Sequence, residues 1–209
     1  MRWQVITRCV AIILALAMAG PGAHADVAQP LHDDELLRGR FIQERTLAGF
    51  AAPLRSEGSF VLAPGVGLIW RAETPFAVTT LMTPQGLAQQ SEGATTLDLP
   101  ASRAPFMATL YDMLGGALGG DWRGLERDFT VVKTEADGKW MLELLPRKGA
   151  DAGGMPFAQI NVTGAAFVER VEIAKVGGDR DVLELLDQKR QPAPLTADEL
   201  ELLQEVGKP

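Results

Sequence analysis

The residues LRSEGSFVLAPGVGLIWRA, 54–72, contain two runs in which apolar and polar side chains alternate, separated by Pro64-Gly65. Alternation with a period of two is typical of a β-strand that buries one face, and Pro-Gly is a turn sequence. The stretch therefore predicts two short strands joined by a turn. The second strand, 66–72, places three apolar side chains on one face: Val66, Leu68 and Trp70.

The same alternation of apolar and polar residues continues through most of the chain, with turn residues between the runs. Asp137-Gly138 is a strong hairpin signal, because both turn residues tolerate a positive φ. About eleven strands in all are too many for one flat open sheet, so the pattern predicts a sandwich or a curled, barrel-like sheet. The expected strands are 41–48, 54–63, 66–72, 76–82, 85–90, 94–99, 128–134, 139–145, 157–163, 167–176 and 181–189.

Helices are expected at three places: 31–38, 104–118 and 197–206. The last helix has a capping box, in which Thr196 and Glu199 satisfy each other's backbone N–H groups. Its Leu200 and Leu203 are expected to face the body of the protein. The internal helix, 104–118, has apolar residues at helical spacing and is rich in methionine and glycine. Two interpretations stay open for it, a movable lid over an apolar cavity and an ordinary core helix.

The first 25 residues have the pattern of a secretory signal peptide. Arg2 and Arg8 precede the short apolar run 10–19, and Ala23-His24-Ala25 is a small-x-small cleavage site. The prediction is a signal peptide over 1–25 and one domain over 26–209. An anchoring helix is the alternative, but the apolar run is shorter than the ~20 residues that span a bilayer.

Removing this segment changes the charge and the cysteine count. Without Arg2 and Arg8 the chain has 18 basic and 27 acidic residues, a net charge of −9. This argues against a nucleic-acid partner and against tight binding to an anionic membrane surface. The only cysteine, Cys9, leaves with the signal peptide, so the domain depends on its core for stability.

The sequence offers little for catalysis. His32 is the only histidine after residue 25, it lies in the acidic stretch HDDE, and no G-x-S-x-G motif presents a serine. No second histidine or cysteine completes a metal site, and no glycine-rich stretch matches a phosphate-binding loop. A pair of carboxylates remains conceivable, but nothing singles out two of the acids. The chain is therefore predicted to be non-enzymatic, without metal or cofactor.

Several motifs resemble those of the periplasmic outer-membrane lipoprotein carriers, the LolA-like family. They are Phe41-x-Gln43, Pro53-Leu54-x-Ser56-x-Gly58-x-Phe60, Gly67-Leu68-Ile69-Trp70 and Pro75-Phe76, with weaker echoes at Trp140-x-Leu142-x-Leu144-x-Pro146 and Phe167-x-x-Arg170-Val171-x-Ile173. In order and spacing the likeness covers nearly the whole of 26–209. None of these motifs is catalytic.

The resemblance implies a single-domain, mainly β fold: an unclosed, strongly curved antiparallel β-barrel with a few helices as a lid over its concave face. It also implies a role. Family members accept an acylated lipoprotein from an inner-membrane transporter, shield its acyl chains and deliver it to an outer-membrane acceptor. The expected protein is thus a periplasmic monomer whose cargo is a lipoprotein or a lipid.

A cavity lined by apolar side chains follows from this interpretation. The residues expected to bind lipid are Phe60, Leu68, Trp70, Phe76, Leu81, Phe106, Met107, Leu110, Met113, Trp140 and Leu142. For each of them, simple core packing is the alternative.

One departure from the family concerns the turn between the second and third strands. The carriers usually have an arginine there that latches the lid, whereas this turn, 62–66, has none. Arg45, Arg55 and Arg71 are candidate substitutes. The chain therefore resembles a divergent member, and an envelope sensor or interaction protein on the same fold is the alternative function. An enzyme acting on envelope lipid or glycan is the third.

Overall fold

The structure is a computed structural model, and it describes residues 30–103, 125–127, 129–147 and 157–207. The predicted signal peptide and the predicted helix 104–118, with Phe106, Met107, Leu110 and Met113, lie outside these residues. Within the described part of the chain, no helix has both the length and the apolar character needed to cross a bilayer.

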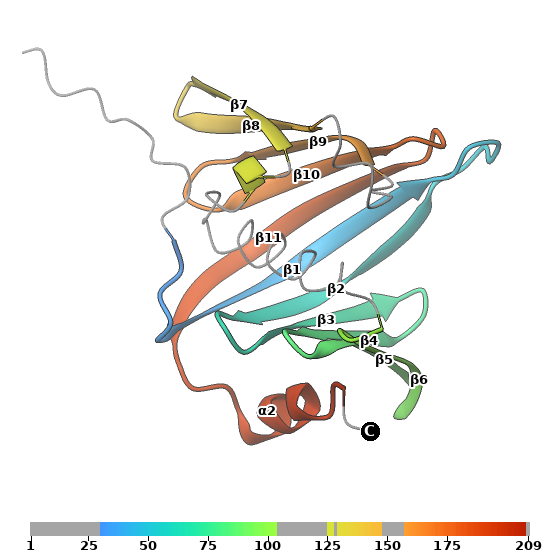
Figure 1. Cartoon of the computed structure of the whole chain (residues 1–209), viewed down its shortest axis with the longest axis vertical. Helices are drawn as coiled ribbons and strands as arrows, with labels where there is room; N and C mark the ends of the chain where they lie inside the picture. The colour runs from blue at the N-terminus through green and yellow to red at the C-terminus, as the bar shows by residue number, and fades with distance from the viewer. Residues whose placement is uncertain (1–29, 104–124, 128, 148–156, 208–209) are drawn as a thin grey trace, which may run out of the picture.

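Eleven antiparallel strands form a single sheet, as the alternation predicted (Figure 1). The spatial order is β6-β5-β4-β3-β2-β1-β11-β10-β9-β8-β7, so the first and last strands pair at the centre. The bounds are β1 Glu35–Thr46, β2 Leu54–Ala63, β3 Gly67–Thr74, β4 Val78–Thr83, β5 Gly86–Ser91, β6 Ala94–Pro100, β7 Phe129–Ala136, β8 Lys139–Pro146, β9 Phe157–Gly164, β10 Val168–Lys175 and β11 Arg180–Pro192.

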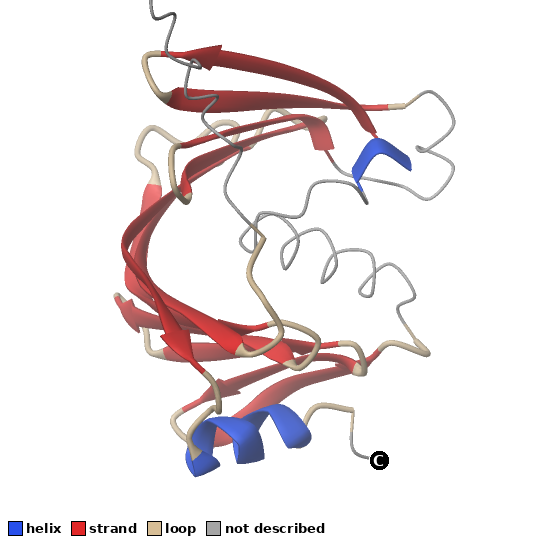
Figure 2. Cartoon of the chain, turned by 90° about the vertical axis from the view of Figure 1, so that its left-hand side faces the viewer, coloured by secondary structure: helices blue, strands red, loops and turns tan. Residues whose placement is uncertain are grey.

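The sheet is strongly curved and does not close (Figure 2). Its two outer strands, β6 and β7, are the ends of the strand order and are not neighbours in it. Seen from the side, the strands form an arc around one concave face, and the short 3-10 helix η1, Leu125–Arg127, lies on that side. The expected fold, an unclosed antiparallel β-barrel, is therefore confirmed.

The predicted helix 31–38 is wrong, because β1 already begins at Glu35. The backbone turns just before, where the Glu35 N–H donates to the His32 carbonyl at 3.0 Å. From there Leu37 lies between Leu62 of β2 and Arg190 of β11 in the sheet register. Leu37 and Phe41 share a strand face and are both 1% exposed, so pairing on two sides outweighs the helical propensity of this segment.

The turns largely follow the sequence. Pro64-Gly65 joins β2 to β3, with a hydrogen bond from the Val66 N–H to the Ala63 carbonyl and a φ of +69° at Gly65. Val66, expected in the strand, closes this turn and is exposed. The Asp137-Gly138 hairpin between β7 and β8 is confirmed, with φ values of +54° and +73°.

The C-terminal helix α2, Ala197–Gln204, packs on the convex face of the sheet (Figure 2). Its capping box, Thr196 with Glu199, is present as predicted. Leu203 is buried against Val61, Ile69 and Leu81, and the expectation for Leu203 is confirmed. The expectation for Leu200 is wrong, because the helix turns that side chain to solvent and leaves it 41% exposed.

Candidate functional site

Two apolar clusters lie on opposite faces of the sheet. The smaller cluster on the convex face is covered by α2. The larger one occupies the concave face and draws on both halves of the strand order, from β3 on one side to β7 on the other. Partly buried apolar side chains surround the larger cluster, among them Trp70, Val171, Ile173 and Leu183. The concave face is therefore a continuous apolar surface with an accessible margin.

Aromatic rings on β1, β2 and β3 are stacked at the centre of this face. Trp70 lies over Phe41, with ring centroids 3.9 Å apart and planes inclined by 23°, and its centroid is 5.7 Å from that of Phe60. The Phe60 ring covers Gly39, where a β-carbon would come within 2.7 Å of it. Glycine on the neighbouring strand thus leaves room for the ring, an arrangement that also fixes strand register.

An aromatic ring also packs over a glycine of the neighbouring strand in the other half of the sheet. Trp140 of β8 lies directly opposite Gly164 of β9, and a β-carbon at that glycine would be 2.6 Å from the indole ring. The indole Nε1–H donates to the Ala165 carbonyl at 2.6 Å. The ring is 1% exposed, so its single polar group is satisfied inside the apolar cluster.

The structure brings five of the predicted lipid-binding residues together on the concave face: Phe60, Leu68, Trp70, Trp140 and Leu142. It does not bring Leu81 to them, because Leu81 is buried on the convex face beneath α2. Phe76 precedes β4 in the β3–β4 connection and is 77% exposed. The structure leaves the lipid-binding role of all these residues a prediction.

Sequence reasoning missed several residues of the same surface. Apart from Leu125, which lies in η1, each alternates along a strand with polar or oppositely facing residues, so its signal was present in the sequence. The additional buried members are Leu37, Phe41, Leu62, Leu125, Phe129, Leu144, Ile160, Val162, Val168 and Leu185.

Comparison with known protein families identifies the chain. The family model described as "outer membrane lipoprotein carrier protein LolA-like" matches residues 20–182. The chain belongs to this LolA-like family. A search of curated proteins finds no match.

Solved structures similar to this LolA-like chain are distant in sequence. A LolA superfamily protein from Nitrosomonas europaea is 10% identical, covers 84% of this chain and 94% of its own, and has a TM-score of 0.43. LprF from Mycobacterium bovis is 14% identical, with coverages of 77% and 88% and a TM-score of 0.35. The lipoprotein LppX from Mycobacterium tuberculosis is 9% identical, with coverages of 77% and 89% and a TM-score of 0.38.

Two of the three arginines considered as latch substitutes are held by carboxylates. Arg45 donates from Nε to the nearly buried Asp181 at 2.9 Å, and Lys175 contacts the other oxygen of Asp181 at 2.7 Å. Arg55 pairs with Glu44 at 3.3 Å. Arg71 has no ion pair with another described residue. A latching role for any of them remains a prediction for this LolA-like chain.

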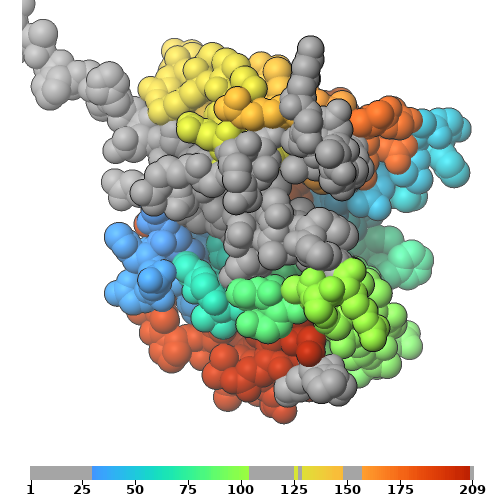
Figure 3. Space-filling model, viewed as in Figure 1, coloured from blue at the N-terminus to red at the C-terminus, as the bar shows by residue number. Residues whose placement is uncertain are grey.

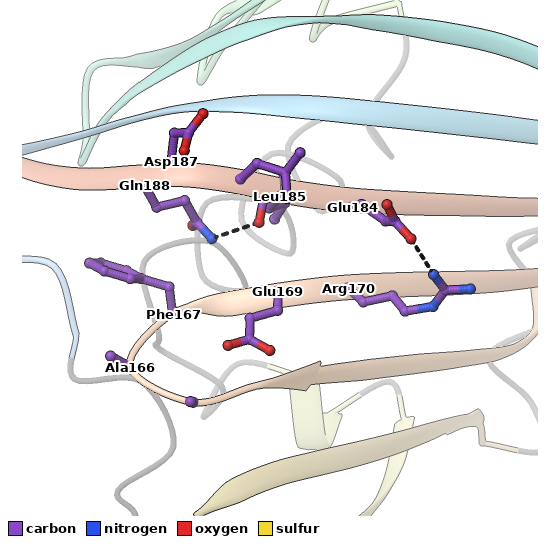
Figure 4. Close-up of a pocket in the computed structure, with 10 residues that line it drawn as sticks. Ala166, Phe167, Glu169, Arg170, Glu184, Leu185, Asp187 and Gln188 are labelled. Atoms are coloured by element: carbon purple, nitrogen blue, oxygen red, sulfur yellow. Dashed lines mark hydrogen bonds and ion pairs between the residues drawn. The ribbon is translucent and has the colours of Figure 1, made fainter.

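A hollow of about 470 Å³ lies where β10 and β11 separate (Figure 4). The two strands pair only from Arg170 to Ala174, and Asp187, with a φ of +52°, lies in the irregular stretch of β11 beyond. The side-chain amide of Gln188 spans the separation and donates to the Val168 carbonyl at 2.6 Å. Arg170 and Glu184, 2.6 Å apart, line the hollow. Charged and apolar side chains line it together, and two of the apolar ones, Phe167 and Leu185, also belong to the concave-face cluster or pack against it.

No group of histidine, cysteine or acidic side chains among the described residues is arranged to hold a metal ion. His32 is exposed in the turn before β1. The most extensive feature of the described residues of this LolA-like chain is the apolar cluster on the concave face.

Proposed function

We propose that the chain is a periplasmic carrier that binds the acyl chains of a lipoprotein or lipid on its concave face and shuttles them from the inner to the outer membrane. The observation that supports this most is the continuous apolar cluster on that face, with a margin of partly buried side chains.

The energetics of acyl chains explain why such a surface is useful. Each buried methylene contributes about 0.8 kcal/mol, so a sixteen-carbon chain left in water costs roughly 12 kcal/mol. A carrier must shield this chain and release it again. Large aromatic and aliphatic side chains on an open, curved sheet suit non-directional contacts of this kind.

The other parts of the proposal are supported by the likeness to family members and by the pattern of the first 25 residues. The cargo is an acylated lipoprotein or a lipid, received from an inner-membrane transporter and given to an outer-membrane acceptor. The carrier acts as a monomer, without enzymatic activity, metal or cofactor, and reaches the periplasm through the signal peptide at 1–25. The predicted lipid-binding residues that share the concave face are its contact surface.

The direct test is mass spectrometry of organic extracts from the protein purified out of its native periplasm. A defined acylated species at near-stoichiometric amount is expected, and its mass identifies the cargo. An empty protein that also fails to take up a fluorescent fatty acid would contradict the proposal and favour an envelope sensor or interaction protein on the same fold.

A pair of valines tests which face binds the acyl chain. Val171 of β10 and Val182 of β11 are both half-buried, but Val171 borders the concave cluster whereas Val182 is outside both apolar clusters. Val171→Asn should lower fatty-acid affinity about tenfold, because an amide without partners costs about 1–3 kcal/mol to bury. Fluorescent fatty-acid titration measures this change.

Val182→Asn is the matched control, with the same substitution on a neighbouring strand. It should leave affinity within about twofold, and urea unfolding of both variants shows whether either has lost its fold. Equal losses of affinity in the two variants would contradict binding on the concave face.

A further inference from the structure

We infer that the β1–β2 and β10–β11 hairpins together form a docking surface for the headgroup region of a neutral phospholipid bilayer. We call this surface the hairpin tip; it comprises residues 47–54 and 176–178. The inference goes beyond carriage of an acyl chain, since it concerns how the protein meets a membrane. It holds whether or not the concave face carries cargo.

The β1–β2 connection is an apolar loop that is turned outward. Residues 47–54, LAGFAAPL, contain no charged side chain and no side-chain hydrogen-bond donor or acceptor. Phe50 is 67% exposed and Leu54 is 60% exposed. Exposed contiguous apolar patches of this kind mark interaction sites. These eight consecutive residues are therefore a candidate contact surface on an otherwise acidic chain.

The β10–β11 turn adds to the same surface. Val176 is 75% exposed and is followed by Gly177-Gly178. The Ala48 N–H donates to Asp179 Oδ1 at 2.9 Å, and a β-carbon at Gly178 would lie 3.7 Å from that of Ala48. The two hairpins therefore touch, and Figures 1 and 3 show them side by side, projecting at one end of the molecule.

The charges behind the hairpin tip are neutralised by one another. Arg45 and Lys175 share Asp181, Arg55 pairs with Glu44 and Glu57, and Asp179 accepts a hydrogen bond from the Ala48 N–H. Three cationic side chains thus lie among four carboxylates. The tip thus presents apolar side chains in front of ion pairs, with no excess of basic groups. A whole-chain charge of −7 further opposes adsorption to anionic lipid, so the surface suits a zwitterionic bilayer.

The shape of the hairpin tip favours a bilayer over a protein partner. Stable protein interfaces bury about 800 Å² on each partner across broad complementary faces. Here two turns project side by side (Figures 1 and 3), and their large exposed apolar side chains are Phe50, Leu54 and Val176. Projecting apolar side chains of this kind insert among lipid headgroups without requiring a complementary surface.

Flotation with phosphatidylcholine vesicles tests the inference on the chain lacking residues 1–25. The wild-type protein should float with the vesicles, and adding 0.5 M sodium chloride should leave the bound fraction unchanged. Phe50→Ser should lower the partition coefficient about tenfold or more, because one fully buried aromatic side chain contributes that much to transfer from water. Val176→Ser should lower it less.

Leu200→Ser is the matched control, since Leu200 is an exposed apolar residue on α2, away from the hairpins. It should float like the wild type. Circular dichroism checks that every variant is folded. The inference is overturned if the wild type does not bind these vesicles, if binding requires anionic lipid, or if Leu200→Ser weakens binding as much as Phe50→Ser. Absence of vesicle binding would favour a protein partner for the hairpin tip.

Discussion

Gly58→Ala is expected to destabilise the protein by about 3 kcal/mol or more, the upper range for inserting a group into a packed site. A β-carbon at Gly58 would lie 1.8 Å from the Arg71 carbonyl oxygen and 3.0 Å from the Ala72 Cα, so the collision is with backbone. A rotamer change cannot relieve it. The β2–β3 register shifts between Glu57 and Gly58, which brings the β3 backbone over this position. Urea unfolding followed by circular dichroism measures the loss.

Gly177→Ala is the control for this prediction. Apart from Gly177 and its two chain neighbours, no residue has an atom within 4 Å of a β-carbon placed there, and the φ of Gly177 is not positive. The substitution should change the free energy of unfolding by less than about 1 kcal/mol, with a small gain from a less flexible unfolded chain. If Gly58→Ala were as stable as Gly177→Ala, this result would contradict the close approach of the β3 backbone to Gly58.

Glu199→Gln is expected to cost about 2 kcal/mol by releasing the C-terminal helix from β1. Glu199 accepts two hydrogen bonds from the Arg38 guanidinium, at 2.5 and 2.8 Å, and one from the Thr196 backbone N–H at 3.0 Å. Glutamine retains the capping interaction but removes the charge. Arg38 is then left without its carboxylate in a half-buried site, which is the costly part of breaking an ion pair.

The same pair predicts how stability depends on pH. The Arg38 hydrogen bonds lower the pKa of Glu199 from 4.5 to about 2, against the opposing effect of burial. A carboxyl with a lowered folded-state pKa stabilises the protein above pH 4.5, and this contribution is lost as the pH falls from 4.5 to about 2. Full conversion of the shift gives about 3 kcal/mol, which partial exposure of the pair reduces to about 1–2 kcal/mol.

Glu201→Gln on the exposed side of α2 is the matched control. No ion pair joins Glu201 to another described residue, so its unfolding free energy should match that of the wild type across pH 2–7. The difference in stability between Glu199→Gln and Glu201→Gln should shrink below pH 4.5. A difference that stays constant down to pH 2 would contradict the assigned role of the Glu199 charge.

The strands were predictable because half-burial leaves a period of two in the sequence, and Asp137-Gly138 and Pro64-Gly65 mark turns by their backbone preferences. Thr196 and Glu199 likewise predict the start of α2, because a capping box is formed by residues close together in the sequence. The start of β1 was not predictable in this way. Its conformation depends on pairing with β11, whose partner residues lie at the far end of the chain.

The site was predictable only in part, for a related reason. Alternation shows that a strand has two faces but does not tell which face is concave. Phe60 and Leu81 are both buried apolar strand residues, yet they pack on opposite sides of the sheet. Phe76 fits the same apolar pattern but falls in a connection, where no neighbouring strand buries it. Only the register and curvature of the sheet separate these cases.

The pairing of the first and last strands at the centre of the sheet has a consequence for the order of folding. Each strand from β1 to β6 pairs with the next one along the chain, and the strands from β7 to β11 do the same. The two groups meet only along β1 and β11, where Thr46 is opposite Arg180 and Glu35 is opposite Pro192. Pairing β1 with β11 closes a loop that includes all the strands between them. This step is slow, because the chain loses entropy before the stabilising contacts form. The β1–β11 pairing therefore forms last. A chain truncated before β11 leaves two half-sheets whose unpaired edge strands are prone to aggregate.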